Sequence, residues 1–397
     1  MRIVLLGATG FVGHHLLPRL SAAGHDCLAL SRYRMAVREL SIIPRVEVRQ
    51  TDVHDPEKLA ACLRGADAAI NMVGILNEPG RNGKGFHRAH VELVERLIAA
   101  CRTAGVRRFV QVSALNAGKG KSHYLVSKGE AEERIRAAGD LDATILQPSV
   151  IFGEGDSFFN RFAGLLKLAP VLPLACPDAL MQPVWVGDVA AAIVAALPDK
   201  STFGRTLVLV GPRAYSLREL VTFTARMSGS KCRIVGLSDS LSRLQARVMD
   251  LVPGKPFSTD NYRSLQTPNT SEDNSLPELG IEPRSVESVV PGMLGVPAHQ
   301  YRLDEFRKIL KSSSFRKHYE GLYMGEDIAL SRVPKGYDAN NPAAEFLKLK
   351  SFFSMSFGPV EVGENRIPIN LKDFVININN PKIRIEATFI EGSVQWI

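Results

Sequence analysis

The stretch 2-RIVLLGATGFVGHHLL-17 decides the fold. Its apolar start, 2–7, is typical of a buried strand, and apolar residues at helical spacing follow the glycines Gly7, Gly10 and Gly13. In a strand–turn–helix unit, Gly7 permits the tight turn, Gly10 lets the backbone approach a pyrophosphate, and Gly13 lets the helix pack closely. The stretch therefore predicts a nucleotide site, and a glycine-rich turn without a ligand is the alternative.

The alternation of strand and helix continues along the first part of the chain. Apolar strands separated by amphipathic helices predict βαβ units, and such units give a parallel sheet with right-handed crossovers. The expected class is α/β, with a Rossmann-like doubly wound parallel sheet. The expected strands are 2–7, 26–32, 46–52, 68–76, 107–115 and 142–153, and the expected helices are 11–23, 86–105 and 124–139.

Changes in pattern divide the chain into three expected parts. A nucleotide-binding domain spans 1–156, a smaller α/β lobe for substrate or a partner spans 157–297, and an additional α+β segment spans 298–397. For the lobe we expect helices 186–197 and 216–228, strands 206–211 and 232–237, a polar stretch 258–287, and an ending at 288–295. For the last segment we expect a helix over 301–322 and a strand–turn–strand unit around Asn379-Asn380-Pro381.

Composition narrows the class of protein. The chain has 397 residues and a net charge of +8, but its basic residues are interspersed with acidic ones, which argues against nucleic-acid binding. Its five cysteines are far apart and form no CxxC pair, so neither a zinc site nor a disulfide framework is expected. No apolar run approaches the ~18 residues that cross a bilayer. We expect a cytoplasmic protein that meets a membrane, if at all, peripherally.

The end of the second strand predicts which cofactor binds. An acidic residue there would hold the ribose 2′-hydroxyl of NAD, but the chain has Ser31 and Arg32. A cation favours a 2′-phosphate, so NADP(H) is preferred and NAD(H) is the alternative. Asp52 and Val53 after the third strand are expected beside the adenine. Asn71 and Gly74 after the fourth are expected near the cofactor as well.

Three residues further along predict acid–base chemistry. Ser113 follows the fifth strand, and Tyr124 and Lys128 are four apart on one helix face. An ammonium beside a phenol favours the phenolate, so we expect Lys128 to lower the pKa of Tyr124 and to hold the nicotinamide ribose. Ser113 is expected to bind the substrate oxygen.

Two further features have simpler explanations. His87 and His90 lie three apart on a helix, but no third ligand accompanies them, so we expect no metal site. Asp188 precedes a helix and is expected to cap it, with positioning of loops in the lobe as the alternative.

The first ~295 residues resemble an extended short-chain dehydrogenase/reductase of the NAD-dependent epimerase/dehydratase superfamily. Gly7, Gly10, Gly13 and the set Ser113, Tyr124 and Lys128 match its signature. Within it, the stretches HRAHVELVERLIAACRTAGVRRFVQVSALNA, ILQPSVIFGEGDSFFNRFA and QPVWVGDVAAAI resemble the branch related to subunit 9 of the alpha subcomplex of respiratory complex I. His90 stands where sugar-nucleotide epimerases usually carry asparagine.

The resemblance implies NADP(H) in the crevice of the Rossmann domain. We expect an oxidoreductase or epimerase-like enzyme acting on a carbonyl, alcohol or quinone-related substrate. The alternative is a non-catalytic NADPH-holding subunit of respiratory complex I or of a quinone-biosynthesis assembly. The expected cofactor contacts are Gly7, Thr9, Gly10, Phe11, Val12, Gly13, Ser31, Arg32, Asp52, Val53, Asn71, Gly74, Lys128 and Pro148.

The segment after 298 is similar to something else. Residues 303–356 resemble part of an uncharacterised bacterial family (DUF2461) through FRKHYEGL, RVPKGYD and AAEFLKLKSF. The abrupt join predicts a fused chain, and no function is carried onto this segment.

Overall fold

The computed structural model describes residues 1–32, 40–78, 80–253 and 255–294, and five strands between 360 and 396. The chain forms two compact units, Met1–Tyr301 and Arg302–Ile397. Within the described residues, no helix is both long and apolar enough to span a bilayer.

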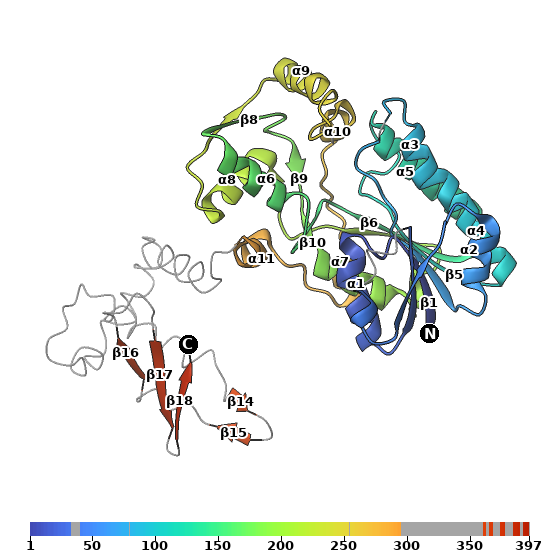
Figure 1. Ribbon diagram of the computed structural model, residues 1–397, viewed down its shortest axis with the longest axis horizontal. Coiled ribbons are helices and arrows are strands. Elements are labelled where there is room, and N and C mark those ends of the chain that lie inside the picture. The colour runs from blue at the N-terminus through green and yellow to red at the C-terminus, as the bar shows by residue number, and fades with distance from the viewer. Residues whose placement is uncertain are drawn as a thin grey trace. The chain divides into compact units, whose positions relative to one another are not determined.

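A seven-stranded parallel sheet forms the centre of the first unit (Figure 1). Its strand order, β3-β2-β1-β4-β5-β6-β11, reverses direction between β1 and β4, as in a doubly wound fold. This order confirms the predicted fold class. The strands are β1 (Arg2–Leu6), β2 (Asp26–Ser31), β3 (Val46–Gln50), β4 (Ala68–Asn71), β5 (Arg108–Val112), β6 (Asp142–Pro148) and β11 (Thr206–Leu209).

Helices cover both faces of this sheet, because alternate residues of each buried strand point to opposite sides. Ile3 and Leu5 lie on the face of the sheet that packs against α1 (Phe11–Ala22) and α7 (Val186–Ala196). Val4 and Leu6 pack on the opposite side. The helices of that opposite face are α2 (Pro56–Leu63), α4 (Leu93–Ala104) and α5 (His123–Ala137) (Figure 1).

Three elements of this domain differ from the sequence prediction. The helix expected in the smaller lobe at 186–197 is α7, which packs on the central sheet with α1. The strand expected in the smaller lobe at 206–211 is β11, which joins the central sheet by pairing Leu207 with Leu146. Its apolar side chains Leu207 and Leu209 are buried there. The chain therefore contributes a strand to the first domain after it has formed part of the lobe. Helix α2 was not expected, although its N-cap Asp55 accepts from the backbone N–H of Lys58 and Pro56 occupies its first turn.

The smaller lobe combines short two-stranded sheets with helices (Figure 1). The predicted strand 142–153 breaks after Pro148, and its last part forms β7. The polar stretch 258–287 contains a helix with a capping box at Ser258, and the expected ending is also a helix. The lobe comprises β7 (Ile151–Phe152), α6 (Phe159–Leu168), β8 (Val171–Leu174), β9 (Leu180–Met181), β10 (Val184–Trp185), β12 (Tyr215–Ser216), α8 (Leu217–Met227), β13 (Arg233–Gly236), α9 (Asp239–Met249), α10 (Thr259–Leu265) and α11 (Val286–Met293).

The second unit contains antiparallel strands. The predicted hairpin is confirmed, because Phe374–Asn377 (β16) pairs with Arg384–Phe389 (β17), which continues to Gly392–Trp396 (β18). Val360–Val362 (β14) pairs with Asn365–Ile367 (β15). The helix expected over 301–322 lies outside the described residues.

Candidate functional site

The turn between β1 and α1 requires glycine for steric reasons. Gly7 has a φ of +77°, and a Cβ there would lie 2.9 Å from the backbone of Met72 and Val73. A Cβ on Gly13 would collide with the carbonyl group of Ala8, because α1 packs directly on the chain that precedes it. Any side chain at either position would therefore move α1 away from the sheet.

The N-terminus of α1 is open to a ligand. Gly10 is its N-cap, is exposed, and receives no side-chain cap from the described residues. A Cβ on Gly10 would meet only the carbonyl oxygen of Gly7, at 3.1 Å. Thr9, Phe11 and Val12 around it are partly exposed. Uncapped backbone N–H groups at a helix start suit an anion, so the turn fits the pyrophosphate of a dinucleotide.

The residues predicted to contact the adenosine lie at the carboxyl ends of β2 and β3. Ser31 is buried, and its carbonyl accepts from the backbone N–H of Thr51 at 2.9 Å. Arg32 is exposed beside it. Asp52 is exposed and accepts from the backbone N–H of His54 at 2.9 Å, whereas Val53 is buried. The parallel pairing of β2 and β3 thus brings the four predicted residues to one edge of the sheet.

The loop after β4 faces helix α5. Asn71 is buried, donates to Gln111 at 2.9 Å and accepts from the backbone N–H of Val73 at 3.1 Å, so its side chain shapes this loop. A Cβ on Gly74 would lie 3.5 Å from Lys128 Nζ. The structure therefore brings Gly74 and Lys128 together, as the prediction of a shared cofactor region requires.

Lys128 is almost completely buried. Its Nζ donates to the carbonyls of Val112 at 3.3 Å and Val73 at 3.4 Å. Burial lowers the pKa of the ammonium to about 8, although the charge of Glu132 opposes this shift. Two carbonyls hold one cation in a region of low dielectric constant, and a ribose hydroxyl is a further acceptor for it.

Tyr124 lies on the same helix in an aromatic cluster. Its ring packs edge-on against Phe86, with centroids 6.1 Å apart, and against His90, at 5.6 Å. Its hydroxyl has no hydrogen-bond partner among the described residues. Burial raises the pKa of the phenol to about 12. The expectation that Lys128 lowers this pKa is not met, because the ammonium is turned towards backbone carbonyls and burial dominates.

Ser113 has a different partner from the one expected. Its hydroxyl donates to Glu132 Oε1 at 2.5 Å, within the sheet–helix core. The Glu132 carboxylate also accepts from Gln147 at 2.8 Å and from Arg136 at 2.6 Å. A role for Ser113 in substrate binding therefore stays a prediction, and it requires the hydroxyl to leave Glu132.

His90 has a structural role that the sequence did not indicate. Its Nε2 accepts from the backbone N–H of Ile75 at 3.3 Å, so Nδ1 carries the proton and donates to Ser127 Oγ at 2.8 Å. Ser127 in turn donates to the Tyr124 carbonyl at 2.9 Å. Burial lowers the pKa of His90 to about 2, so the ring is neutral and joins the loop after β4 to α5. The only signal was the departure from asparagine at this position.

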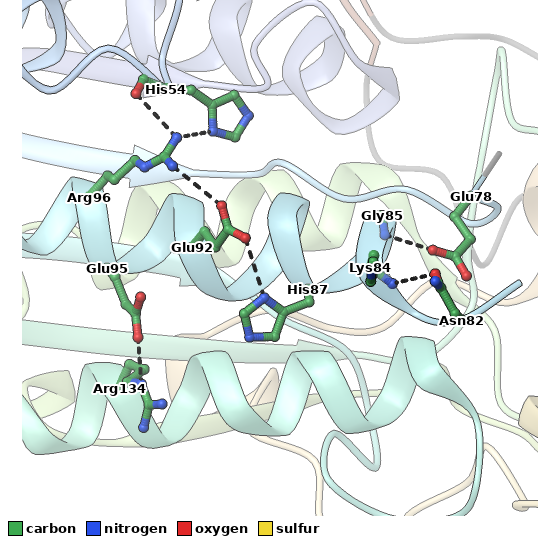
Figure 2. A network of polar contacts seen from close by, with 10 residues as sticks. All are labelled: His54, Glu78, Asn82, Lys84, Gly85, His87, Glu92, Glu95, Arg96 and Arg134. Atoms are coloured by element: carbon green, nitrogen blue, oxygen red, sulfur yellow. Dashed lines mark hydrogen bonds and ion pairs between the residues drawn. The ribbon is translucent and has the colours of Figure 1, made fainter. Parts of the chain in front are cut away.

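A π-helical turn places His90 inward. The chain runs through α3 (Lys84–His87), the π segment Arg88–Glu92 and α4 as one continuous helix. Figure 2 shows the polar contacts along its outer side: Arg96 donates to His54 Nδ1 at 2.8 Å, and Glu95 pairs with Arg134 of α5 at 2.7 Å. His87 lies on this outer side, with its Nδ1 3.6 Å from Glu92 Oε1 (Figure 2), so it does not converge with His90.

Carboxylates from the lobe and from α7 fix the surroundings. Asp260 accepts from the backbone N–H groups of His123, at 2.7 Å, and Tyr124, at 3.1 Å, so it anchors α10 on the start of α5. Contrary to the expectation, Asp188 does not cap α7. It lies in the first turn and accepts from the backbone N–H of Arg284 at 2.8 Å, which fits the alternative of loop positioning. Pro148 ends β6, and its carbonyl accepts from Leu115.

A cavity of about 410 Å³ adjoins the aromatic cluster. Phe86, which contacts Tyr124, lines it together with His123. The opposite walls come from the lobe, through residues of α9, α10 and the segment between them: Arg247, Asp250, Lys255, Ser258, Thr259, Asp260 and Arg263.

Known proteins resemble both parts of the chain. A family model described as NAD(P)H-binding matches residues 7–158, and one described as a conserved hypothetical protein (DUF2461) matches residues 298–371. The second match agrees with the resemblance found in the sequence.

Two curated relatives cover most of the first unit. The mitochondrial NADH dehydrogenase (ubiquinone) 1 alpha subcomplex subunit 9 of Arabidopsis thaliana is 31% identical over 289 residues, which are 68% of this chain and 71% of the relative. A ceramide reductase of Caulobacter vibrioides is 33% identical over 253 residues, which are 60% of this chain and 74% of the relative.

A solved structure extends the likeness to the fold. The dTDP-glucose 4,6-dehydratase of Streptomyces venezuelae, solved with NAD, has a TM-score of 0.60 and 20% identity, and the match covers 76% of this chain and 97% of that one. The dinucleotide turn, the sheet order and these relatives lead to one assignment. The chain carries an NAD(P)H-binding domain and belongs to the family of the NADH dehydrogenase (ubiquinone) 1 alpha subcomplex subunit 9.

Proposed function

We propose that this protein is an NADPH-dependent reductase that acts on a carbonyl group of an apolar or quinone-like substrate. The observation that carries the proposal is the pair Tyr124 and Lys128. The Tyr124 ring contacts Phe86, which lines the lobe cavity, and its hydroxyl has no partner in the described part of the chain. The buried ammonium of Lys128 faces the loop after β4.

The protonation states favour reduction over oxidation. With a pKa of about 12, the Tyr124 phenol keeps its proton at neutral pH and can donate it to a developing alkoxide. Lys128 carries its charge below a pKa of about 8 and would stabilise negative charge in the buried site. The bound nicotinamide would supply the hydride from C4.

Cofactor preference and substrate class are part of the same proposal. Arg32, at the end of β2, would face the 2′-phosphate and favour NADP(H) over NAD(H). A relative named as a ceramide reductase supports an apolar substrate.

The second candidate is a non-catalytic NADPH-holding subunit at the face of a membrane assembly. The bond from Ser113 to Glu132 supports it, since it draws the hydroxyl away from a substrate. Relatives named as subunits of NADH dehydrogenase support it too.

Oxidation of NADPH by the purified full chain, with quinones and long-chain carbonyl compounds, separates the two candidates. A reductase turns over, and Tyr124→Phe lowers turnover by about 10²-fold or more without changing NADPH affinity. If NADPH binds but no substrate is reduced, and Tyr124→Phe leaves the cellular phenotype unchanged while Gly10→Asp abolishes it, the holding role replaces the enzyme.

A further inference from the structure

Helix α9 has the reverse of the usual surface pattern. Its buried side carries the small residues Ser242 and Ala246. Its exposed side carries Leu241, Leu244 and Val248, whose spacing of three and four residues places them on one face. Surface helices normally bury large apolar side chains and expose polar ones. The outward face of α9 therefore has an unused capacity for apolar contact.

The apolar surface continues beyond the end of the helix. Leu251 and Val252 follow in the turn after α9 and are also exposed. We call the surface formed by Leu241, Leu244, Val248, Leu251 and Val252 the α9 face. The exposed fractions of these five residues range from 39% to 75%. Single exposed leucines are ordinary, but a contiguous set marks an interaction surface.

Arginines border the α9 face. Arg247 and Arg263 are exposed and form no ion pair within the described residues. Arg243 is paired with Asp239 at 3.5 Å, and both side chains are more than half exposed. Arg81 is exposed, and among the described residues it donates to one backbone carbonyl, that of Asp250, at 3.4 Å. The border is thus rich in exposed cations.

Apart from the exposed Asp239, two carboxylates close to this border accept hydrogen bonds within the protein. Asp250 accepts from the backbone and the hydroxyl of Thr259, the latter at 2.6 Å. Asp260 accepts from the two N–H groups at the start of α5. These acids satisfy local donors and offset the outward-facing arginines only in part.

The α9 face also adjoins the cavity that Phe86 lines. Arg247, one helical turn from Leu244 and next to Val248, lines the 410 Å³ cavity, and so does Phe86, which packs on Tyr124. Leu76 is exposed in the loop after β4, and its carbonyl accepts from Asn261 of α10 at 3.3 Å. The α9 face therefore lies next to this cavity through Arg247.

From this arrangement we infer that the α9 face docks on a bilayer surface that carries anionic headgroups. Leu241, Leu244, Val248 and Leu251 would enter the boundary between headgroups and acyl chains, and the arginines would contact the headgroup phosphates. A second copy of the chain is the weaker occupant, because a two-fold contact would bring two sets of these arginines together. Delivery of an apolar substrate from the bilayer to the cavity rests on the proposed function, whereas docking itself does not.

Co-sedimentation of the full chain with vesicles tests the inference. The wild-type chain should bind phosphatidylcholine vesicles that contain phosphatidylglycerol, and bind pure phosphatidylcholine vesicles weakly. Binding should fall at about 1 M salt, where the screening length is ~3 Å. The double substitution Leu244→Glu with Val248→Glu should weaken binding by about tenfold or more. The carboxylates remove apolar contact with the acyl chains and repel the anionic headgroups. Ile42→Glu, an equally drastic change at an exposed site beside β3, is the matched control and should bind like wild type.

Several outcomes overturn the inference. Failure of the wild-type chain to bind anionic vesicles overturns it directly. An equal loss of vesicle binding in the double variant and in the Ile42→Glu control also overturns it. If the double variant instead converts a dimer to a monomer, with no change in vesicle binding, the α9 face joins two copies. NADPH affinity, measured on the same samples, should be unchanged in all variants. Vesicle binding without any NADPH-dependent turnover would reject the proposed reductase and leave docking intact.

Discussion

The dinucleotide turn and the Tyr124 region are built on different principles. At the turn, the backbone makes the candidate site: Gly7 and Gly13 have no room for a Cβ, and the start of α1 has no side-chain cap. Around Tyr124, side chains make the site, and the partner of each comes from a distant part of the chain. A local motif therefore reports reliably on nucleotide binding, whereas the capacity for chemistry depends on contacts that no short motif contains.

The largest expected effect is on the free energy of unfolding, and it concerns the dinucleotide turn. Gly13→Ala should lower the free energy of unfolding by about 3 kcal/mol or more, because its Cβ collides with the Ala8 carbonyl group. Gly164→Ala, the same change within α6 where no atom lies within 4 Å, should raise it by up to ~1 kcal/mol. Urea unfolding of both variants measures the difference. Equal effects would show that close packing of α1 is unimportant.

The pH dependence of stability tests the burial of Lys128 in the Tyr124 region. Its pKa is about 8 in the folded protein and 10.5 when unfolded, so the unfolded state binds more protons between these values. The stability of wild type relative to Lys128→Met should therefore be constant below pH 8 and rise by about 3 kcal/mol up to pH 10.5. Reductase turnover of wild type should fall above pH 8. A stability difference that does not vary with pH would contradict the burial of this charge.

A substitution of Arg32 tests the cofactor preference predicted for the dinucleotide-binding region. Arg32→Asp should weaken NADPH binding by about 10- to 100-fold, because a carboxylate repels the 2′-phosphate, and should leave NADH binding within about threefold. Fluorescence titration with both nucleotides measures the two affinities. An equal loss for both would remove Arg32 from the role of selecting the cofactor.

Ser113 should have the smallest effect. If its hydroxyl serves Glu132, Ser113→Ala lowers the free energy of unfolding by about 1–2 kcal/mol, since Gln147 and Arg136 still donate to that carboxylate. Turnover should then fall by less than about tenfold. A loss of 10²-fold in turnover with full stability would instead place Ser113 on the substrate.

The same contrast explains what the sequence could predict. The sheet, its glycine turn and the edge carrying Ser31 and Asp52 follow from local pattern, because parallel strands end at one edge. The partner of Ser113 did not follow from it, since Glu132 is brought to β5 only when α5 packs on the sheet. The place of β11 in the central sheet was missed because a short apolar strand carries no mark of its neighbour.

His90 illustrates the limit for polar side chains. Its role depends on two hydrogen bonds, to the backbone of Ile75 and to Ser127, and on a π-helical turn that directs the ring inward. The spacing of His87 and His90 suggested only a shared helix face. In the structure one ring lies outside and the other is buried, because the extra residue in the π turn changes the angle between them.

The dissociation constant of NADPH for Gly10→Asp and for Tyr124→Phe, set beside that of wild type, tests the separation of the two regions most directly. The expected result is loss of detectable binding in Gly10→Asp, whose carboxylate would occupy the pyrophosphate position at the start of α1, and unchanged affinity in Tyr124→Phe. Circular dichroism should show both variants folded. If Gly10→Asp binds NADPH as wild type does, the nucleotide does not lie on the glycine turn and the account is contradicted.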